Sequence, residues 1–259
     1  MQLTVLASGS GGNSSLLRIG EGGILVDAGL GPRLMRDRWA HLNLGHRALE
    51  HVLVTHGHLD HSRSAGALAR RQNATLHCAP SMTTHRALAR APRYAELRAG
   101  SEQVLECREG TVRVRSALLP HDCDPTLGFR LECAGRRVVI LTDLGKPDAA
   151  VARHLADPHV LLLEFNYDED MLREGPYPDV LKRRVAGDRG HLSNLQAQKQ
   201  LALLAGPSLH TLVLGHISQK NNTPDLAIKA AESELARLNR SDVRVLVAQQ
   251  DQALDGIQV

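Results

Sequence analysis

The sequence predicts an α/β fold of the αββα type, in which two mixed β-sheets pack face to face between two layers of helices. Two observations predict this four-layer sandwich. Short apolar runs rich in β-branched residues follow one another through the first half, and strand and helix patterns interleave in the second. A single doubly wound parallel sheet would alternate strands and helices throughout. No linker, repeat or low-complexity segment divides the chain, so we expect one domain over residues 1–259.

The expected strands are short apolar runs bounded by turn-forming residues. They cover residues 3–7, 15–19, 23–28, 51–55, 75–78, 112–119, 127–133, 137–142, 159–165, 209–215 and 243–249. The runs 127–133 and 137–142 are close enough in sequence to form a hairpin. Helical patterns occupy residues 32–42, 62–72, 82–90, 148–155, 195–204 and 225–238. Ser193, and Thr223 followed by Pro224, are typical of helix starts.

Composition limits the class of protein. The first residues lack a basic start followed by a long apolar stretch, and no run reaches the roughly eighteen apolar residues of a membrane span, so neither export nor a membrane is expected. The four cysteines form no CxxC pair, which favours reduced thiols in the cytoplasm. The net charge of +3 permits an anionic substrate. Aromatic residues make up only 2%, which disfavours a groove that stacks many bases.

The segment HGHLDH at residues 56–61 directly follows an expected strand. Alternate residues of a tight loop can point into one cavity, so His56 and His58 can bind one ion while Asp60 and His61 reach a second. Three imidazoles and a carboxylate suit divalent ions such as zinc, manganese or iron. Four incidental polar residues in a loop are the alternative, but a metal site explains all four at once.

The string THGHLDH at residues 55–61 resembles the HxHxDH signature of the metallo-β-lactamase superfamily, and the resemblance implies that superfamily's αββα fold. It also implies where further ligands lie, because each candidate follows an expected strand. His121 would complete the first metal site, Asp143 would bridge both metals, and His216 would close the second. Each of these three could singly be a capping or surface residue, but their order and context favour the ligand interpretation.

Further segments narrow the resemblance to the YycJ (WalJ) family. They are ASGSGGNSS (7–15), LVDAGL (25–30), HDCDPTLGF (121–129), LTDLG (141–145), LEFNYDEDMLREGPYP (163–178), GHLSN (190–194) and LGHISQKNNTP (214–224). Members of this bacterial family are regarded as metal-dependent exonucleases that degrade DNA from the 5′ end and are linked with mismatch repair. The resemblance therefore implies two divalent ions, Zn²⁺ or Mn²⁺, a single- or double-stranded DNA substrate with a 5′ phosphate, and mismatch-repair proteins as partners.

Hydrolysis at such a site needs no protein nucleophile, because two adjacent divalent ions can generate hydroxide and clamp the phosphate under attack. Asp60, which would hold one ion, is therefore expected to be essential for catalysis. The leaving 3′ oxygen still needs a proton, and His191 is the candidate donor. The His191 motif is similar to the loop histidine that assists cleavage in ribonuclease Z, and Glu164 resembles the acid that pairs with that histidine. A helix-capping or buried, hydrogen-bonded His191 is the structural alternative.

Other candidates would support the metal site or bind phosphate. Asp27 follows an apolar strand, at a position where this superfamily commonly keeps an acid that orients a ligand histidine, although a turn is an equal alternative. Phosphate could be bound by a glycine and serine loop, by the start of a helix after His191, and by two asparagines after His216. These candidates are Ser8, Ser10, Asn13, Ser193, Asn194, Asn221 and Asn222. Hairpin, capping and turn roles are their alternatives.

Several basic residues lie close in sequence to these motifs. Lys182, Arg183, Arg184 and Arg189 flank His191, and residues 70–71, both arginines, end the helix that follows the metal motif. They could track a DNA backbone, but a basic run is more often a solvated face.

Three functions remain open from the sequence. The first is a two-metal-dependent phosphodiesterase that acts as a 5′-to-3′ DNA exonuclease in mismatch repair. The second uses the same site on RNA or on a small or cyclic phosphodiester, since the metal motif alone does not choose. The third is a catalytically inactive, metal-bound binding or sensing module, which the complete set of predicted ligands disfavours. The oligomeric state is unknown from the sequence.

Overall fold

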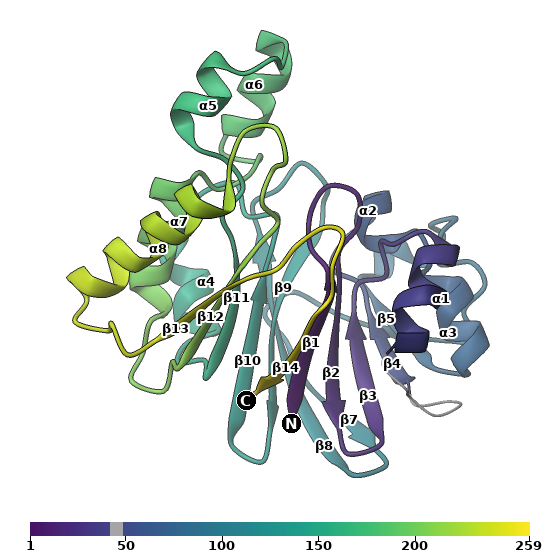
Figure 1. Ribbon diagram of the computed structural model, residues 1–259. Coiled ribbons are helices and arrows are strands. Elements are labelled where there is room, and N and C mark those ends of the chain that lie inside the picture. The colour runs from purple at the N-terminus through teal and green to yellow at the C-terminus, as the bar shows by residue number, and fades with distance from the viewer. Residues whose placement is uncertain (42–48) are drawn as a thin grey trace.

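The computed structural model describes residues 1–41 and 49–259 and contains two seven-stranded sheets packed face to face (Figure 1). The first sheet consists of β1 (Gln2–Ala7), β2 (Ser14–Ile19), β3 (Gly22–Val26), β4 (Leu49–Leu53), β5 (Thr75–Cys78), β6 (Arg93–Glu96) and β14 (Leu254–Gln258). The second consists of β7 (Glu102–Cys107), β8 (Gly110–Leu119), β9 (Thr126–Cys133), β10 (Arg136–Leu141), β11 (Val160–Glu164), β12 (Thr211–Gly215) and β13 (Arg244–Val247).

Both sheets are mixed, as the sequence predicts. The first has the order β14-β1-β2-β3-β4-β5-β6, and its pairs are antiparallel up to β3 and parallel from β3 to β6. The second has the order β13-β12-β11-β10-β9-β8-β7, antiparallel from β7 to β10 and parallel from β10 to β13. Neighbouring parallel strands end at the same edge, so the residues that follow them are brought together.

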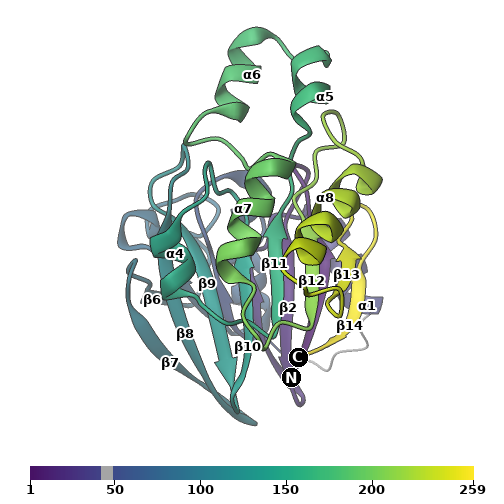
Figure 2. The same ribbon diagram turned by 90° about the vertical axis from the view of Figure 1, so that its left-hand side faces the viewer.

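Helices cover the outer faces of both sheets, which confirms the αββα sandwich. The helices are α1 (Pro32–His41), α2 (Leu59–Ser62), α3 (Ala65–Gln72), α4 (Ala149–His154), α5 (Glu169–Glu174), α6 (Asp179–Ala186), α7 (Asn194–Leu204) and α8 (Pro224–Arg237), with a 3₁₀ turn η1 (Pro80–Met82). α1 and α3 lie on the first sheet (Figure 1), whereas α4, α7 and α8 lie on the second (Figure 2). None of the helices in the described ranges has the length and apolar character needed to span a bilayer.

The alternation of side chains along β10 shows how the layers are joined. Val138 and Ile140 are buried between the two sheets, where Phe129 of β9 also packs. Val139 and Leu141 are buried on the opposite face, in the cluster that includes residues of α7 and α8. Full burial of each such side chain stabilises the fold by about 1.5–3 kcal/mol. A strand buried on both faces reads as a continuous apolar run, which is why the sequence predicts β10 well.

Two predicted helices differ from the structure. The helix expected at 62–72 is divided into α2 and α3, and Ser62 ends α2 instead of starting a helix. The helix expected at 82–90 is wrong, because this segment forms successive turns closed between residues three apart, such as Leu88 N to His85 O at 2.9 Å. The carbonyl oxygen of Ala87 accepts from Gly66 N of α3 at 3.1 Å, so packing against α3 uses a carbonyl that a helix would need. The last residue expected in the first helix, Leu42, lies outside the described residues.

Several elements have no counterpart in the sequence prediction, namely β6, β7, β14, α5 and α6. β7 is an edge strand in which Glu102 and Glu106 are exposed, and its only adjacent apolar residues are Val104 and Leu105. α5 and α6 form a small arm beyond the sandwich, at the end opposite both termini (Figure 1). Helix starts at Ser193 and Thr223 are confirmed, because both side chains accept hydrogen bonds from backbone N–H groups of the first turn.

Two histidines of the first sheet form a pair in which His77 is buried and His51 is half-buried. His51 Nδ1 lies 2.9 Å from His77 Nε2, across neighbouring strands β4 and β5, and His77 is 3% exposed. Burial, assisted by His51, lowers the pKa of His77 to about 4. The folded protein therefore holds His77 neutral at pH values where an unfolded chain, with a histidine pKa near 6.5, takes up a proton.

His77 should therefore make the protein less stable in acid. The unfolded state binds more protons between about pH 6.5 and about pH 4, so the free energy of unfolding falls as the pH drops through that window. Urea unfolding at pH 7 and pH 5 measures how far the free energy of unfolding falls between these two pH values. This fall should be about 2 kcal/mol smaller for His77→Phe than for the unsubstituted protein. His41→Gln, which removes an exposed histidine, is the control. An equal fall in His77→Phe and the unsubstituted protein would contradict this account.

Candidate metal centre

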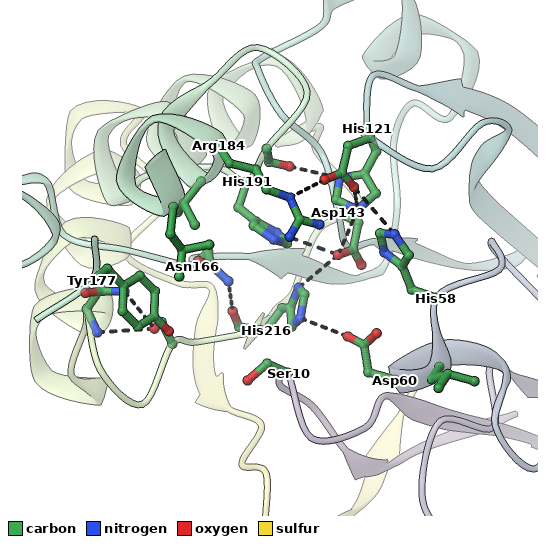
Figure 3. Close-up of a pocket in the computed structure, with 17 residues that line it drawn as sticks. Ser10, His58, Asp60, His121, Asp143, Asn166, Tyr177, Arg184, His191 and His216 are labelled. Atoms are coloured by element: carbon green, nitrogen blue, oxygen red, sulfur yellow. Dashed lines mark hydrogen bonds and ion pairs between the residues drawn. The ribbon is translucent and has the colours of Figure 1, made fainter. Parts of the chain in front are cut away.

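The predicted ligands lie just beyond strand ends, at the end of the sandwich that carries the α5–α6 arm. Segment 56–61 follows β4, and its Asp60 and His61 are on α2. His121 follows β8, Asp143 follows β10, and His216 directly follows β12. Loops from both sheets therefore meet at one place (Figure 3).

The structure brings the seven predicted ligand side chains together in the predicted grouping. Among the predicted ligands, three groups have ligand atoms within 4.8 Å of one another: His56, His58 and His121; Asp60, His61 and His216; and His56, His61 and Asp143. A fourth group joins Asp143 and His216 to Glu164 and His191. The Asp143 carboxylate lies between the first two groups, 3.0 Å from His61 Nε2, 3.7 Å from His121 Nε2 and 3.4 Å from His216 Nδ1. From this position the Asp143 carboxylate could contact an ion in either group.

The imidazole hydrogen bonds fit a metal site. In His56 and His61, Nδ1 faces Thr55 Oγ1 at 3.0 Å and Asp27 Oδ2 at 2.7 Å respectively, and in His121 it faces Gly190 O at 3.0 Å. In His56 and His121, a proton on Nδ1 leaves the Nε2 lone pair available as a ligand. His61 Nε2 lies 3.0 Å from both Asn13 Nδ2 and Asp143 Oδ2. Nε2 of His56 and of His121 is buried and has no hydrogen-bond partner among residues 1–41 and 49–259. Such unpaired buried atoms are costly unless a ligand occupies them.

The electrostatics also favour a cation. Burial alone would raise the pKa of Asp143, but His216 and His61 hold it well below the usual range. Burial would lower the pKa of His61, but Asp143 and Asp27 raise it well above the usual value. Burial, with neighbouring histidines, lowers the pKa of His56, which keeps it a neutral ligand. Negative charge is therefore concentrated where the His61 Nε2 atom points, and a divalent ion would be stabilised there.

Asp27 contacts His61, the position from which it could orient this histidine. Its carboxylate accepts from His61 Nδ1 and, at 2.8 Å, from the backbone N–H of Thr55, and Asp27 is 3% exposed. The Thr55 hydroxyl, 2.9 Å from Asp27 Oδ2, also lies 3.0 Å from His56 Nδ1, so one network fixes ligands of both groups. Sequence reasoning missed Thr55, although it is the first residue of the THGHLDH string.

Three of these residues have a left-handed backbone conformation that directs their side chains toward the site. Asp27, Asp143 and His216 have φ of 62°, 63° and 51°, in the left-handed region that residues with a side chain seldom adopt. Each lies just after a strand, where the turn redirects the chain. Such conformations are costly and persist where surrounding contacts impose them. Gly29 allows another close contact, since an added Cβ would lie 1.6 Å from the Asp60 carbonyl oxygen.

His191 and Glu164 form a pair beside the metal groups. Glu164 ends β11, is fully buried and lies 2.7 Å from His191 Nδ1 through Oε1, while Oε2 accepts from Leu144 N at 2.9 Å. Burial would lower the pKa of His191, but Glu164 and Asp143 raise it to about 9. His191 lines a cavity of about 430 Å³ together with Asp60. Its Nδ1 is committed to Glu164, so a proton passed to a substrate would come from Nε2.

The predicted phosphate-binding residues divide into two sets. Ser10 and Asn221 line the cavity. The others form hydrogen bonds within the protein: Ser8 Oγ with His216 N, Asn13 with the Gly9 backbone, Ser193 with Gln196 N, and Asn194 with Asn222. The Ser8 bond, 2.7 Å long, connects the first sheet to the His216 loop of the second. These contacts hold the loops around the cavity, and Asn13 Nδ2 also lies 3.0 Å from Nε2 of the predicted ligand His61.

The basic residues are also separated. Arg184 lines the cavity, and its Nε donates to Asp122 Oδ2 at 2.6 Å. Arg189 Nε donates to His121 O at 2.8 Å, which supports a ligand loop, and Lys182 bonds within the arm. Arg71 lies at a different hollow, between α1 and α3. Sequence reasoning missed other residues that line the cavity, including Asp122, Asn166, Tyr177, Leu181 and Ser218.

Comparison with known proteins agrees with this geometry. Residues 23–217 match the family described as the β-lactamase superfamily domain. The chain belongs to this superfamily. It is 30% identical over 238 residues to the exodeoxyribonuclease WalJ of Streptococcus pneumoniae, covering 90% of this chain and 88% of that protein. It is 28% identical over 231 residues to the exodeoxyribonuclease YycJ of Bacillus anthracis, covering 88% and 86%.

The solved structures show the same fold. The metallo-β-lactamase fold protein YhfI from Bacillus subtilis superposes with a TM-score of 0.70 at 16% identity, covering 99% of this chain and 100% of that chain. The metallo-β-lactamase fold and the resemblance to the YycJ (WalJ) family are thus confirmed. The chain is a metal-dependent hydrolase, with clusters of histidine and aspartate suited to divalent ions.

Removing the Asp27 charge should weaken metal binding without unfolding the site. Asp27→Asn keeps the size of the side chain but replaces one carboxylate oxygen with an NH₂ group and removes the charge. If the amide oxygen faces His61 Nδ1, the histidine loses a charged acceptor; if the NH₂ group faces it, the histidine loses its fixed tautomer. Titration of metal-free protein with Zn²⁺ against a competing chelator should show affinity lowered about 10- to 100-fold. Asp148→Asn, a substitution at the helix cap of α4, is the control. Unchanged affinity in folded Asp27→Asn would refute the orienting role.

Proposed function

We propose that this protein is a two-metal-dependent phosphodiesterase, a cytoplasmic exonuclease that degrades DNA from its 5′ end in mismatch repair. The observation that carries the proposal is the His191–Glu164 pair beside two overlapping groups of ligand atoms, in a chain similar over most of its length to named exodeoxyribonucleases. Single- or double-stranded DNA with a 5′ phosphate would be the substrate, and mismatch-repair proteins the partners.

In this proposal each ion would be held by a separate group of side chains. His56, His58 and His121 would hold one ion, Asp60, His61 and His216 the other, and Asp143 both. Two ions in these places, Zn²⁺ or Mn²⁺, would supply a hydroxide near neutral pH and neutralise the charge on the phosphate under attack. The protein fixes the imidazoles beforehand through Asp27, Thr55 and the Gly190 carbonyl, so little reorganisation accompanies the reaction.

His191 would donate the proton that the leaving 3′ oxygen requires. Glu164 accepts from His191 Nδ1 and favours the charged imidazole, and Asp143 Oδ1 lies 3.6 Å from the same nitrogen. Positioned general acids of this kind contribute about 10²- to 10⁴-fold to a rate. Ser10 and Asn221, which line the cavity, would contact phosphate, whereas Ser8, Asn13, Ser193, Asn194 and Asn222 would position the surrounding loops.

The test uses metal-free protein reloaded with Mn²⁺ or Zn²⁺ and 5′-phosphorylated, end-labelled DNA, both single- and double-stranded. We expect stepwise release of mononucleotides from the 5′ end. His191→Ala should slow release by about 10²- to 10⁴-fold, because the leaving oxygen loses its acid. Asp60→Ala should abolish release and lower the metal content. His210→Ala, at the opposite end of β12 from His216, is the control and should retain activity.

Other outcomes assign the site differently. If the protein hydrolyses RNA or a cyclic phosphodiester but leaves DNA intact, the proposed phosphodiesterase activity holds and the proposed DNA substrate is wrong. Protein that binds two ions and hydrolyses none of these substrates would contradict the enzymatic proposal and favour a binding module. Release from the 3′ end would contradict the polarity alone.

A further inference from the structure

The α5–α6 arm stands over the cavity as an ordered unit. Its two helices project beyond the sandwich at the end where the predicted metal ligands lie (Figures 1 and 2). Tyr167, Leu172 and Val185 form a small buried cluster within it, against which Tyr177 and Leu181 pack. Asp168 caps α5, and Lys182 Nζ of α6 donates to the carbonyl oxygen of Arg173 in the last turn of α5, at 2.6 Å. The arm has its own core, so it can present fixed side chains to a ligand.

One face of α6 forms a wall of the cavity. Leu181, Arg184 and Val185, at spacings of three and four residues, all line it, as expected for neighbours on one helical face. Val180, which is 72% exposed, lies on a different face. Tyr177, immediately before α6, lines the same cavity and is half-buried. The arm thus directs an aromatic ring, an aliphatic side chain and a guanidinium toward the space above the metal ligands.

The cavity has two chemically different ends. His58 and Asp60 lie at one end and Tyr177 at the other, with His191 and His216 between them (Figure 3). The polar end suits a phosphate, and the Tyr177 end offers a flat apolar surface. A volume of about 430 Å³ is within the range of pockets that bind a single small ligand. One aromatic ring in a site of this size fits one base, in agreement with an aromatic content of 2%.

Arg184 is held where it can bind a phosphate. Asp122 Oδ2 accepts from its Nε at 2.6 Å, and Asp122 Oδ1 lies 3.2 Å from His121 Nε2. Asp122 thus holds the guanidinium beside the first group of predicted ligands. Among the described residues, Asp122 pairs with Arg184 only through Nε. The terminal N–H groups of Arg184 therefore stay available to bind phosphate oxygens.

We propose that the arm forms the subsite for the nucleotide being removed: Tyr177 stacks on its base beside Leu181, and Arg184 pairs with its phosphate. This inference rests on the proposed function, because it places a terminal nucleotide at the metal centre. It adds a base-binding surface that the metal ligands do not supply. A subsite for one nucleotide also accounts for stepwise release of mononucleotides.

The test compares DNA whose 5′-terminal nucleotide carries a base with DNA whose terminal nucleotide is abasic. Stacking of one base on an aromatic ring should lower KM by about tenfold for the base-bearing substrate. Tyr177→Ala should remove this preference, whereas Tyr177→Phe should keep it. Arg184→Gln should raise KM for both substrates equally, with partial recovery in Arg184→Lys. If Tyr177→Ala merely loosened the arm, KM would rise by the same factor for both substrates and the preference for the base would persist. That result would overturn the proposal.

A second measurement is independent of catalysis. Calorimetric titration of metal-free protein should show tighter binding of deoxyadenosine 5′-phosphate than of deoxyribose 5-phosphate, with the difference lost in Tyr177→Ala. Equal binding by the unsubstituted protein would overturn the subsite. If that protein hydrolyses no DNA, the proposed function fails whatever the titration shows. If it hydrolyses both DNA substrates with the same KM, only the subsite fails.

Discussion

The carboxylate of Asp143 is fully buried beyond the end of β10, between the imidazoles of His61 and His216, and the site depends on how its charge is compensated. An uncompensated buried charge costs several kcal/mol, so the surrounding residues must offset it. Because β10, β11 and β12 are parallel, they end at one edge and bring Asp143, Glu164 and His216 together. The imidazoles supply part of the compensation, and the two proposed ions would complete it.

Both sheets are needed to offset the buried charge of Asp143, because neither sheet alone carries all the residues of the site. The first sheet supplies Asp27 and the segment 56–61, and the second supplies His121, Asp143 and His216. Packing between Val138, Ile140 and the facing strands therefore sets the separation of the two halves. Within this interface, the Ser8 hydroxyl accepts from His216 N and ties the first loop of one sheet to the last ligand of the other. A shift between the sheets would separate the ligand groups.

The sequence predicts most of the sandwich, because strands such as β10 and β12 are buried on both faces and form continuous apolar runs. The resemblance to the metallo-β-lactamase superfamily also indicates which histidines and aspartates lie together, because each of the candidates that it implies follows a strand. Edge strand β7 and the arm escape prediction because their apolar signals are only a few residues long. Left-handed turns at Asp143 and His216, and the pairing of Asp122 with Arg184, arise only from tertiary contacts and leave no local pattern.

The central claim is that two ions share this site, and anomalous diffraction from crystals grown with Mn²⁺ tests it most directly. The account predicts two adjacent peaks, with Asp143 in contact with both. One peak should lie among His56, His58 and His121, and the other among Asp60, His61 and His216. A single peak in metal-saturated crystals, or ions bound away from Asp143, would contradict the account.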